Sequence, residues 1–314
     1  MKKTLLCFPL FLLTTAVIIA CGNDDSSSDD SLPENKKITS GTSTTSGVFQ
    51  INAKGTKVCF APGNLQATYD GSTWNWAFAA KQWDYIGYYG ANHDINGNGK
   101  VSFMGTVDLF GWVGESSIWD GAALYGISDA ETVNSRYTYG DIAGETLKSD
   151  WGNTISDGYK WRTLSYSEWL YVFNTRISGS TVNSISNARY TIAVIKIDDK
   201  AVNGIILFPD GITLENSDVT SWGQINGISQ ITNCTSAQWV NLAAKGCAFL
   251  PAAGFRDGNS LRDVNTCCYY WSSSSNTEDV YYAFSVCLNS YELNPAKKYT
   301  RPCGLSVRLV REVE

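Results

Sequence analysis

The stretch WRTLSYSEWLYVFNTR, from Trp161 to Arg176, contains the clearest helix start in the chain. Ser165 precedes Glu168 by three residues, the spacing of a capping box in which each side chain bonds the other residue's backbone N–H. The apolar residues after the cap are Trp169, Leu170, Val172 and Phe173. This pattern predicts a short helix that packs an apolar face on the core of the domain.

A second helix is expected in CTSAQWVNLAAKG, residues 234–246, with Thr235 or Ser236 as its cap and Gly246 as its stop. Short apolar runs such as ARYTIAVIKI, GIILFPDGI and CAFLPAAGF lie around the two helices and end in Asp, Pro or Gly, as strands do. Many short strands with two main helices predict an α+β fold rather than a βαβ repeat.

Two late segments read as strands with alternating faces. In DVYYAFSVCLNS, the set Val280, Tyr282, Phe284, Val286 and Leu288 is expected to face the core, and the set Tyr281, Ala283, Ser285, Cys287 and Asn289 to face solvent or a partner. The segment GLSVRLVRE, residues 304–312, predicts a closing strand with Ser306, Arg308 and Val310 turned outward.

The opening stretch, Trp161 to Arg176, carries a family resemblance. Arg162, Leu164, Glu168, Trp169 and Arg176 resemble the helix-entry motif of the formylglycine-generating-enzyme branch of the C-type-lectin-like fold, also called the sulfatase-modifying-factor-like fold. YYWSSS and GLSVRLVR are similar to the end of this fold in gut bacterial lipoproteins of the major-paralogous-domain kind. The resemblance covers nearly all of residues 48–314, and it implies a scaffold that presents variable loops and strands on one face.

The sequence departs from the active members of this fold. Formylglycine-generating enzymes use cysteines in their site, but fold landmarks alone do not assign Cys287 or Cys303 to those roles. Lectins that bind sugar through calcium use Glu-Pro-Asn or Gln-Pro-Asp, and neither tripeptide occurs here. A binding module is therefore expected rather than an enzyme.

The N-terminal residues predict export. Lys2 and Lys3 precede a short apolar run, so residues 1–20 are expected to be a signal peptide. The Ile18-Ile19-Ala20-Cys21 sequence resembles a bacterial lipobox, which implies lipidation of Cys21 and a lipid anchor in the outer membrane; an ordinary secretory signal is the alternative. Residues 21–46 are polar, acidic at their start and expected to be a flexible tether, and residues 47–314 to be the folded domain. The acidic tract resembles that of surface lipoproteins of the Bacteroidetes, which implies display at the cell surface of a Gram-negative bacterium rather than in the periplasm.

Composition excludes several classes of function. The net charge is −6 and no Lys/Arg-rich segment follows the tether, so nucleic-acid binding is not expected. The single histidine, His93, leaves no multi-histidine metal site, and no cofactor is expected. DINGNGKVS places Asp94, Asn96 and Asn98 at the spacing of a calcium loop, but its twelfth position lacks the bidentate Glu. Both a calcium site and an Asn/Gly-rich turn remain open there.

Paired carboxylates are the other chemical candidate. DLFGW, GIILFPD and FLPAAGFRDG resemble further landmarks of the same family, and they contain Asp108, Asp210 and Asp257 beside aromatic residues or glycine. Glycoside hydrolysis needs two such acids. Hydrogen-bonded acids that stabilise buried turns are the favoured interpretation.

The candidate ligand-binding surface is C-terminal. Of nine cysteines, Cys7 and Cys21 belong to the leader and the lipid anchor, so seven remain in the domain. A second resemblance, to target proteins of diversity-generating retroelements, implies a C-terminal segment whose Asn codons vary toward Tyr, Cys, Ser and Asp; a fixed ligand-binding paralogue is the alternative. The candidate contact residues are Cys267, Cys268, Asp279, Tyr281, Cys287, Asn289, Tyr291, Tyr299 and Cys303. The expected ligand is a protein or glycan of another cell, host or phage, while an adhesin or pilus component and a formylglycine-type enzyme stay as alternatives.

Overall fold

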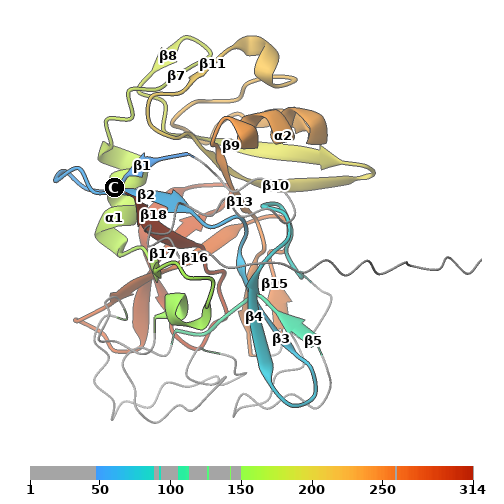
Figure 1. The fold of residues 1–314 in the computed structure, drawn as a ribbon, viewed down its shortest axis with the longest axis vertical. Helices are drawn as coiled ribbons and strands as arrows, with labels where there is room; N and C mark the ends of the chain where they lie inside the picture. Colours follow the sequence, from blue (N-terminus) through green and yellow to red (C-terminus); the bar gives the residue numbers. More distant parts are fainter. Residues whose placement is uncertain are drawn as a thin grey trace, which may run out of the picture. The chain divides into compact units, whose positions relative to one another are not determined.

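A computed structural model describes residues 47–87, 92, 105–112, 126, 142, 150–258 and 260–313 (Figure 1). The predicted leader and tether, Cys21 included, lie outside the described residues, as do Asp94, Asn96 and Asn98. The described part is α+β: short strands predominate and two α-helices accompany them, as the sequence predicted. Within these ranges no helix is both long and apolar enough to cross a membrane.

One sheet joins the start of the domain to its end. Its strand order is β1 (Phe49–Gln50), β2 (Lys57–Phe60), β19 (Leu309–Val313) and β6 (Trp161–Thr163). β19 runs antiparallel to both neighbours, with Val310 opposite Phe60 and opposite Arg162. The closing strand expected near the C-terminus is therefore present, and it lies inside the sheet rather than at its edge.

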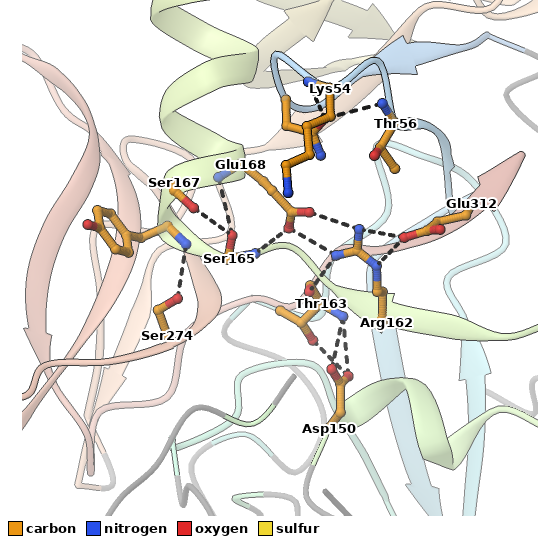
Figure 2. A network of polar contacts seen from close by, with 12 residues as sticks. Lys54, Thr56, Asp150, Arg162, Thr163, Ser165, Ser167, Glu168, Ser274 and Glu312 are labelled. Carbon is orange, nitrogen blue, oxygen red and sulfur yellow. Dashed lines mark hydrogen bonds and ion pairs between the residues drawn. The ribbon is translucent and has the colours of Figure 1, made fainter. Parts of the chain in front are cut away.

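Helix α1 (Tyr166–Leu170) begins at the predicted capping box. The Ser165 hydroxyl accepts from the Glu168 N–H, and the Glu168 carboxylate accepts from the Ser165 N–H at 2.8 Å. A π-helical turn, η4 (Tyr171–Thr175), continues the helix. Figure 2 shows how this helix start is fixed: Arg162 Nη2 donates to Glu168 at 2.9 Å and to Glu312 of β19 at 3.0 Å.

The second sheet has the order β12 (Thr232–Thr235), β9 (Tyr190–Ile197), β10 (Lys200–Leu207) and β13 (Ala248–Pro251). Helix α2 (Ser236–Ala244) packs against it (Figure 1). Thr235 caps α2 in a box with Gln238, and Gly246 follows the helix with a φ of 95°, a left-handed conformation that favours glycine. Both signals read from the sequence are confirmed.

The third sheet carries three of the nine predicted contact residues in its strands, Cys268, Cys287 and Tyr299. Its order is β16 (Cys268–Ser275), β17 (Tyr282–Leu288) and β18 (Leu293–Thr300), all antiparallel. One face packs on a cluster around Trp112, Trp151 and Trp271, and the other on a cluster around Trp169 and Phe173 below α1. The central strand β17 is therefore covered on both faces.

Smaller elements complete the fold. They are the sheet β4 (Trp74–Phe78), β3 (Leu65–Tyr69) and β5 (Gly105–Val107), the sheet β11 (Thr213–Leu214), β7 (Thr181–Val182) and β8 (Ile185–Ser186), the hairpin β14 (Phe255–Asp257) with β15 (Ser260–Arg262), and the 3-10 turns η3 (Trp151–Thr154) and η5 (Asn216–Asp218).

Two arginines hold these sheets together. Arg308 was expected to face outward but is 1% exposed, and its guanidinium donates to the backbone carbonyls of Ala61 at 3.1 Å and Phe249 at 2.8 Å. The outward expectation is wrong because β13 and the segment after β2 both pack over this side of the chain. Arg176 is fully buried and donates to Asp210 at 2.9 Å, so it anchors the end of the α1 region to the end of β10.

Candidate functional site

The seven cysteines of the domain are all buried and none forms a disulfide. This corrects the expectation that Cys267, Cys268, Cys287 and Cys303 occupy a display surface: their exposed fractions are 7%, 0%, 2% and 7%. Their small apolar side chains fill the spaces between packed layers, as buried cysteines generally do.

The predicted solvent face of β17 is also wrong. Ala283 and Ser285 are fully buried and Cys287 nearly so, whereas Val280, assigned to the core, is 36% exposed. The physical reason is that β17 lies between β16 and β18 and has a hydrophobic cluster on each face. Alternation then separates two buried faces rather than a buried face from a wet one.

Four of the five remaining candidates lie in two turns at opposite ends of β17. Asp279 and Tyr281 precede the strand, and the Tyr281 side chain is 48% exposed. Asn289 and Tyr291 follow the strand, where the Asn289 carboxamide oxygen accepts from the Tyr291 N–H at 2.8 Å and Tyr291 is 89% exposed. The nine predicted residues therefore do not form one patch.

Four of them do converge on one face of the third sheet. Cys267, Cys287, Tyr299 and Cys303 belong to the same cluster, while Cys268 points to the opposite face. Tyr299 brings an aromatic ring to this place, and two residues that the sequence analysis did not select complete a group of three rings. We call Phe255, Tyr269 and Tyr299 the ring cluster.

The geometry of the ring cluster is close. The Phe255 ring lies 5.1 Å from that of Tyr269 and 5.3 Å from that of Tyr299, both edge to face, and the two tyrosines are 5.2 Å apart. These separations suit favourable contacts between aromatic rings. Phe255 and Tyr299 are partly exposed and Tyr269 is 7% exposed, so Tyr269 forms the floor and the other two reach the surface.

Charged groups border the ring cluster. In the β14–β15 hairpin Phe255 is opposite Arg262, and Asp257 is two residues along the strand on the same side. The Arg262 and Asp257 side chains are 57% and 53% exposed, with Nε and Oδ2 3.6 Å apart. The Tyr269 hydroxyl donates to Asp263 at 3.1 Å. An aromatic centre with a polar, wet rim is the usual anatomy of a binding surface.

The electrostatics do not favour nucleophilic chemistry at this face. Burial raises the pKa of the Cys287 thiol to about 11, and burial likewise raises the pKa of Cys267 and of Cys303. The pKa of both Tyr269 and Tyr299 is also raised by burial. Since the thiolate is the reactive form, these cysteines have the character of structural rather than activated thiols.

The three candidate acids have separate roles. Asp108 is fully buried and accepts from the Ile86 N–H at 2.7 Å and from Asn92 at 2.8 Å. Asp210 accepts from the Gln50 N–H at 2.7 Å and pairs with Arg176. Both are the hydrogen-bonded acids expected. Asp257 does not fit the expectation of a buried turn acid, because its side chain is exposed on the rim of the ring cluster.

Metal binding finds no support in the described residues, which contain no group of three or more His, Cys, Asp or Glu placed to hold an ion. The calcium candidates lie outside them.

The sequence did not single out these residues: Phe255 lies in FLPAAGFRDG and Tyr269 in YYWSSS, two segments that indicate a fold rather than a site, and Arg262 and Asp263 lie in no motif. The usable signal was the Gly258-Asn259 pair, which is typical of a two-residue hairpin loop, because such a loop pairs Asp257 with Ser260 and therefore Phe255 with Arg262. Comparisons of this chain with protein-family models, with curated proteins and with solved structures find no match.

Proposed function

We propose that this protein is a ligand-binding module, with a C-type-lectin-like domain, held by a lipid on Cys21 at the outer surface of a Gram-negative bacterium. The lipobox-like Ile18-Ile19-Ala20-Cys21 and the acidic residues after it support the anchor and the surface location. The helix-entry motif, with its capping box at Ser165, supports the assignment of the fold.

The contact surface in this proposal is the ring cluster with its charged rim. The observation that carries it is the convergence of Phe255, Tyr269 and Tyr299, from β14, β16 and β18, on one partly exposed face. Rigid aromatic residues give large contact area at low cost in side-chain entropy. Arg262 and Asp257 add polar groups of both signs at the edge, which suits a protein or glycan ligand.

A screen with a matched pair of variants tests this function. The purified protein is applied to an array of bacterial and host glycans and to an array of surface proteins from the same sources. We expect saturable binding on one array, lost in Tyr299→Ala combined with Arg262→Glu. The control is Val240→Ala, which shortens a 55% exposed residue on α2 and is expected to bind like the wild type.

Two outcomes would reject the proposal. Absence of saturable binding on both arrays contradicts a binding module for a protein or glycan. Binding that persists undiminished in the double variant contradicts the ring cluster as its surface. A thermal unfolding curve for each variant separates loss of binding from loss of fold.

A further inference from the structure

A cleft of about 810 Å³ opens at the end of the first sheet. Its walls come from η3, from the segment that leads into β6, and from the last residues of β19. The volume falls within the range of small-molecule sites. The cleft does not include the ring cluster, so any ligand that it holds is distinct from the one proposed above.

One wall of the cleft is fixed by charges that already have partners. Arg162 is held by Glu168 and Glu312, as Figure 2 shows. Asp150 is 3% exposed and accepts from the Gly152 N–H at 2.8 Å and from the Thr163 hydroxyl at 3.1 Å. These groups are satisfied within the protein, so they shape the wall rather than attract an ion.

Arg311 differs from Arg162 in what holds its guanidinium. It lies opposite Trp161 in the β19–β6 pairing, and its guanidinium lies over the Tyr159 ring, 4.3 Å from the ring centroid. Among the described residues no carboxylate pairs with Arg311, and no group accepts a hydrogen bond from its guanidinium. The ring holds the planar group in place through its face, which leaves the N–H donors at its edges for a ligand.

The aromatic residues beside Arg311 are also held in place. The Trp161 indole N–H donates to both carboxylate oxygens of Asp157 at 3.0 Å, and the Trp161 and Tyr159 rings meet edge to face at 6.4 Å. Tyr159 is partly exposed in the cleft. Aromatic side chains beside polar groups suit the mixed apolar and hydroxyl surface of a sugar.

The pairing chemistry of arginine indicates the charged group. A guanidinium fork matches a carboxylate in two parallel hydrogen bonds, which makes such pairs both strong and directional. From the fixed Arg311 and the adjoining rings, we propose that the cleft binds a small sugar bearing a carboxylate, of the uronic-acid type. Arg311 pairs with the carboxylate, and Tyr159 contributes its partly exposed ring to the sugar.

The test is calorimetric titration of the purified protein with digalacturonic acid and with its methyl ester, which keeps the sugar rings and replaces each negative charge by a neutral ester. We expect the acid to bind at least tenfold more tightly than the ester. Arg311→Gln should weaken binding of the acid about tenfold or more and bring it to the level of the ester, and Arg311→Lys should lie between. The control Lys196→Gln removes one exposed positive charge on β9 and should bind like the wild type.

Any of four results would overturn the inference: no binding of the acid, equal binding of acid and ester, wild-type affinity in Arg311→Gln, or displacement of the acid by an equal concentration of acetate, which indicates a simple anion site. A shift of the Trp161 indole N–H resonance on titration is expected and locates the ligand. Loss of binding at the ring cluster leaves this result unchanged, so the two proposals fail independently.

Discussion

Tyr269 and Tyr299 lie on the two outer strands of the third sheet, yet their ring centroids are 5.2 Å apart. The strand between them makes this contact possible, because Ala283 and Cys287 present small side chains on that face of β17. Cys287 is directly opposite Tyr269, and Ala283 directly opposite Tyr299. A cysteine at position 287 is therefore explained by space, without a disulfide or a catalytic role.

A pair of substitutions at Cys287 tests this explanation. Cys287→Ala should be tolerated, because it removes little volume, whereas Cys287→Leu should lower the free energy of unfolding by about 1–3 kcal/mol by overpacking the space under the rings. Urea unfolding of both variants gives the comparison. A leucine variant as stable as the alanine variant would show that the space is not tight.

Thiol labelling tests the burial of the cysteines. At pH 8 the folded protein should react slowly with iodoacetamide at Cys267, Cys268, Cys287 and Cys303, because burial raises the pKa of each thiol and shields it. Unfolding in urea should make all four react fast, as peptide mass spectrometry can follow. Rapid labelling of these residues in the folded protein would contradict their burial and would show that they are exposed, as the sequence predicted.

Local signals in the sequence were good predictors of this fold. The capping boxes at Ser165 and Thr235 each depend on residues three positions apart, so they could be read without knowledge of the tertiary structure. The burial of the two faces of β17 could not be predicted in this way, because alternation distinguishes the two sides of a strand but does not show what covers each side. Cys287, Ala283 and Ser285 are small, and small residues are compatible with both solvent and a close-packed layer.

Contacts between residues far apart in the sequence could not be predicted either. Arg176 was recognised as part of a motif, but its partner Asp210 comes from the end of another strand, and the sequence offers no spacing that links them. The ring cluster likewise unites residues from β14, β16 and β18. Only the pairing of the sheets brings these rings together.

The Arg176–Asp210 pair gives a stability prediction. Arg176 is fully buried and also donates to the Phe208 carbonyl at 2.9 Å, so Arg176→Ala should lower the free energy of unfolding by about 3–5 kcal/mol. Lys298→Ala breaks an ion pair with Glu278 on the surface and should have little effect, because solvent screens it. Similar losses in the two variants would contradict the anchoring role of Arg176.

Asp150 gives a pH prediction. Burial raises the pKa of its carboxyl from 3.8 to about 6, so the folded state holds a proton that the unfolded state releases near pH 4. The free energy of unfolding of the wild type should therefore fall, relative to Asp150→Asn, by up to roughly 3 kcal/mol as the pH rises from 4 to 6. Chemical unfolding at several pH values measures this difference.

Asp70 supplies the control of opposite sign. Backbone hydrogen bonds from Thr73 and Ser72 hold the pKa of its exposed carboxyl well below the ordinary value. Relative to Asp70→Asn, the wild type should lose stability mainly as the pH falls below 4, and change little between 4 and 6. The same trend in both comparisons would contradict a raised pKa for the Asp150 carboxyl.

Diversification of the C-terminal segment remains a genetic prediction. If the segment is diversified, a near-copy of the sequence encoding Cys267 to Cys303, differing only at adenines, lies beside a reverse transcriptase gene. Sequencing of the gene's neighbourhood decides it. Without both features the segment is that of a fixed paralogue, and the proposed binding surface is unaffected.

The most direct test of the binding surface is the affinity of one array-selected ligand for the wild type, Tyr299→Phe and Tyr299→Ala, measured by surface plasmon resonance. Phenylalanine keeps the ring that contacts Phe255 and Tyr269, while alanine removes it. We predict affinity within about threefold of the wild type for Tyr299→Phe, and a loss of at least about tenfold for Tyr299→Ala. Equal affinity in all three proteins would contradict the assignment of ligand binding to the ring cluster.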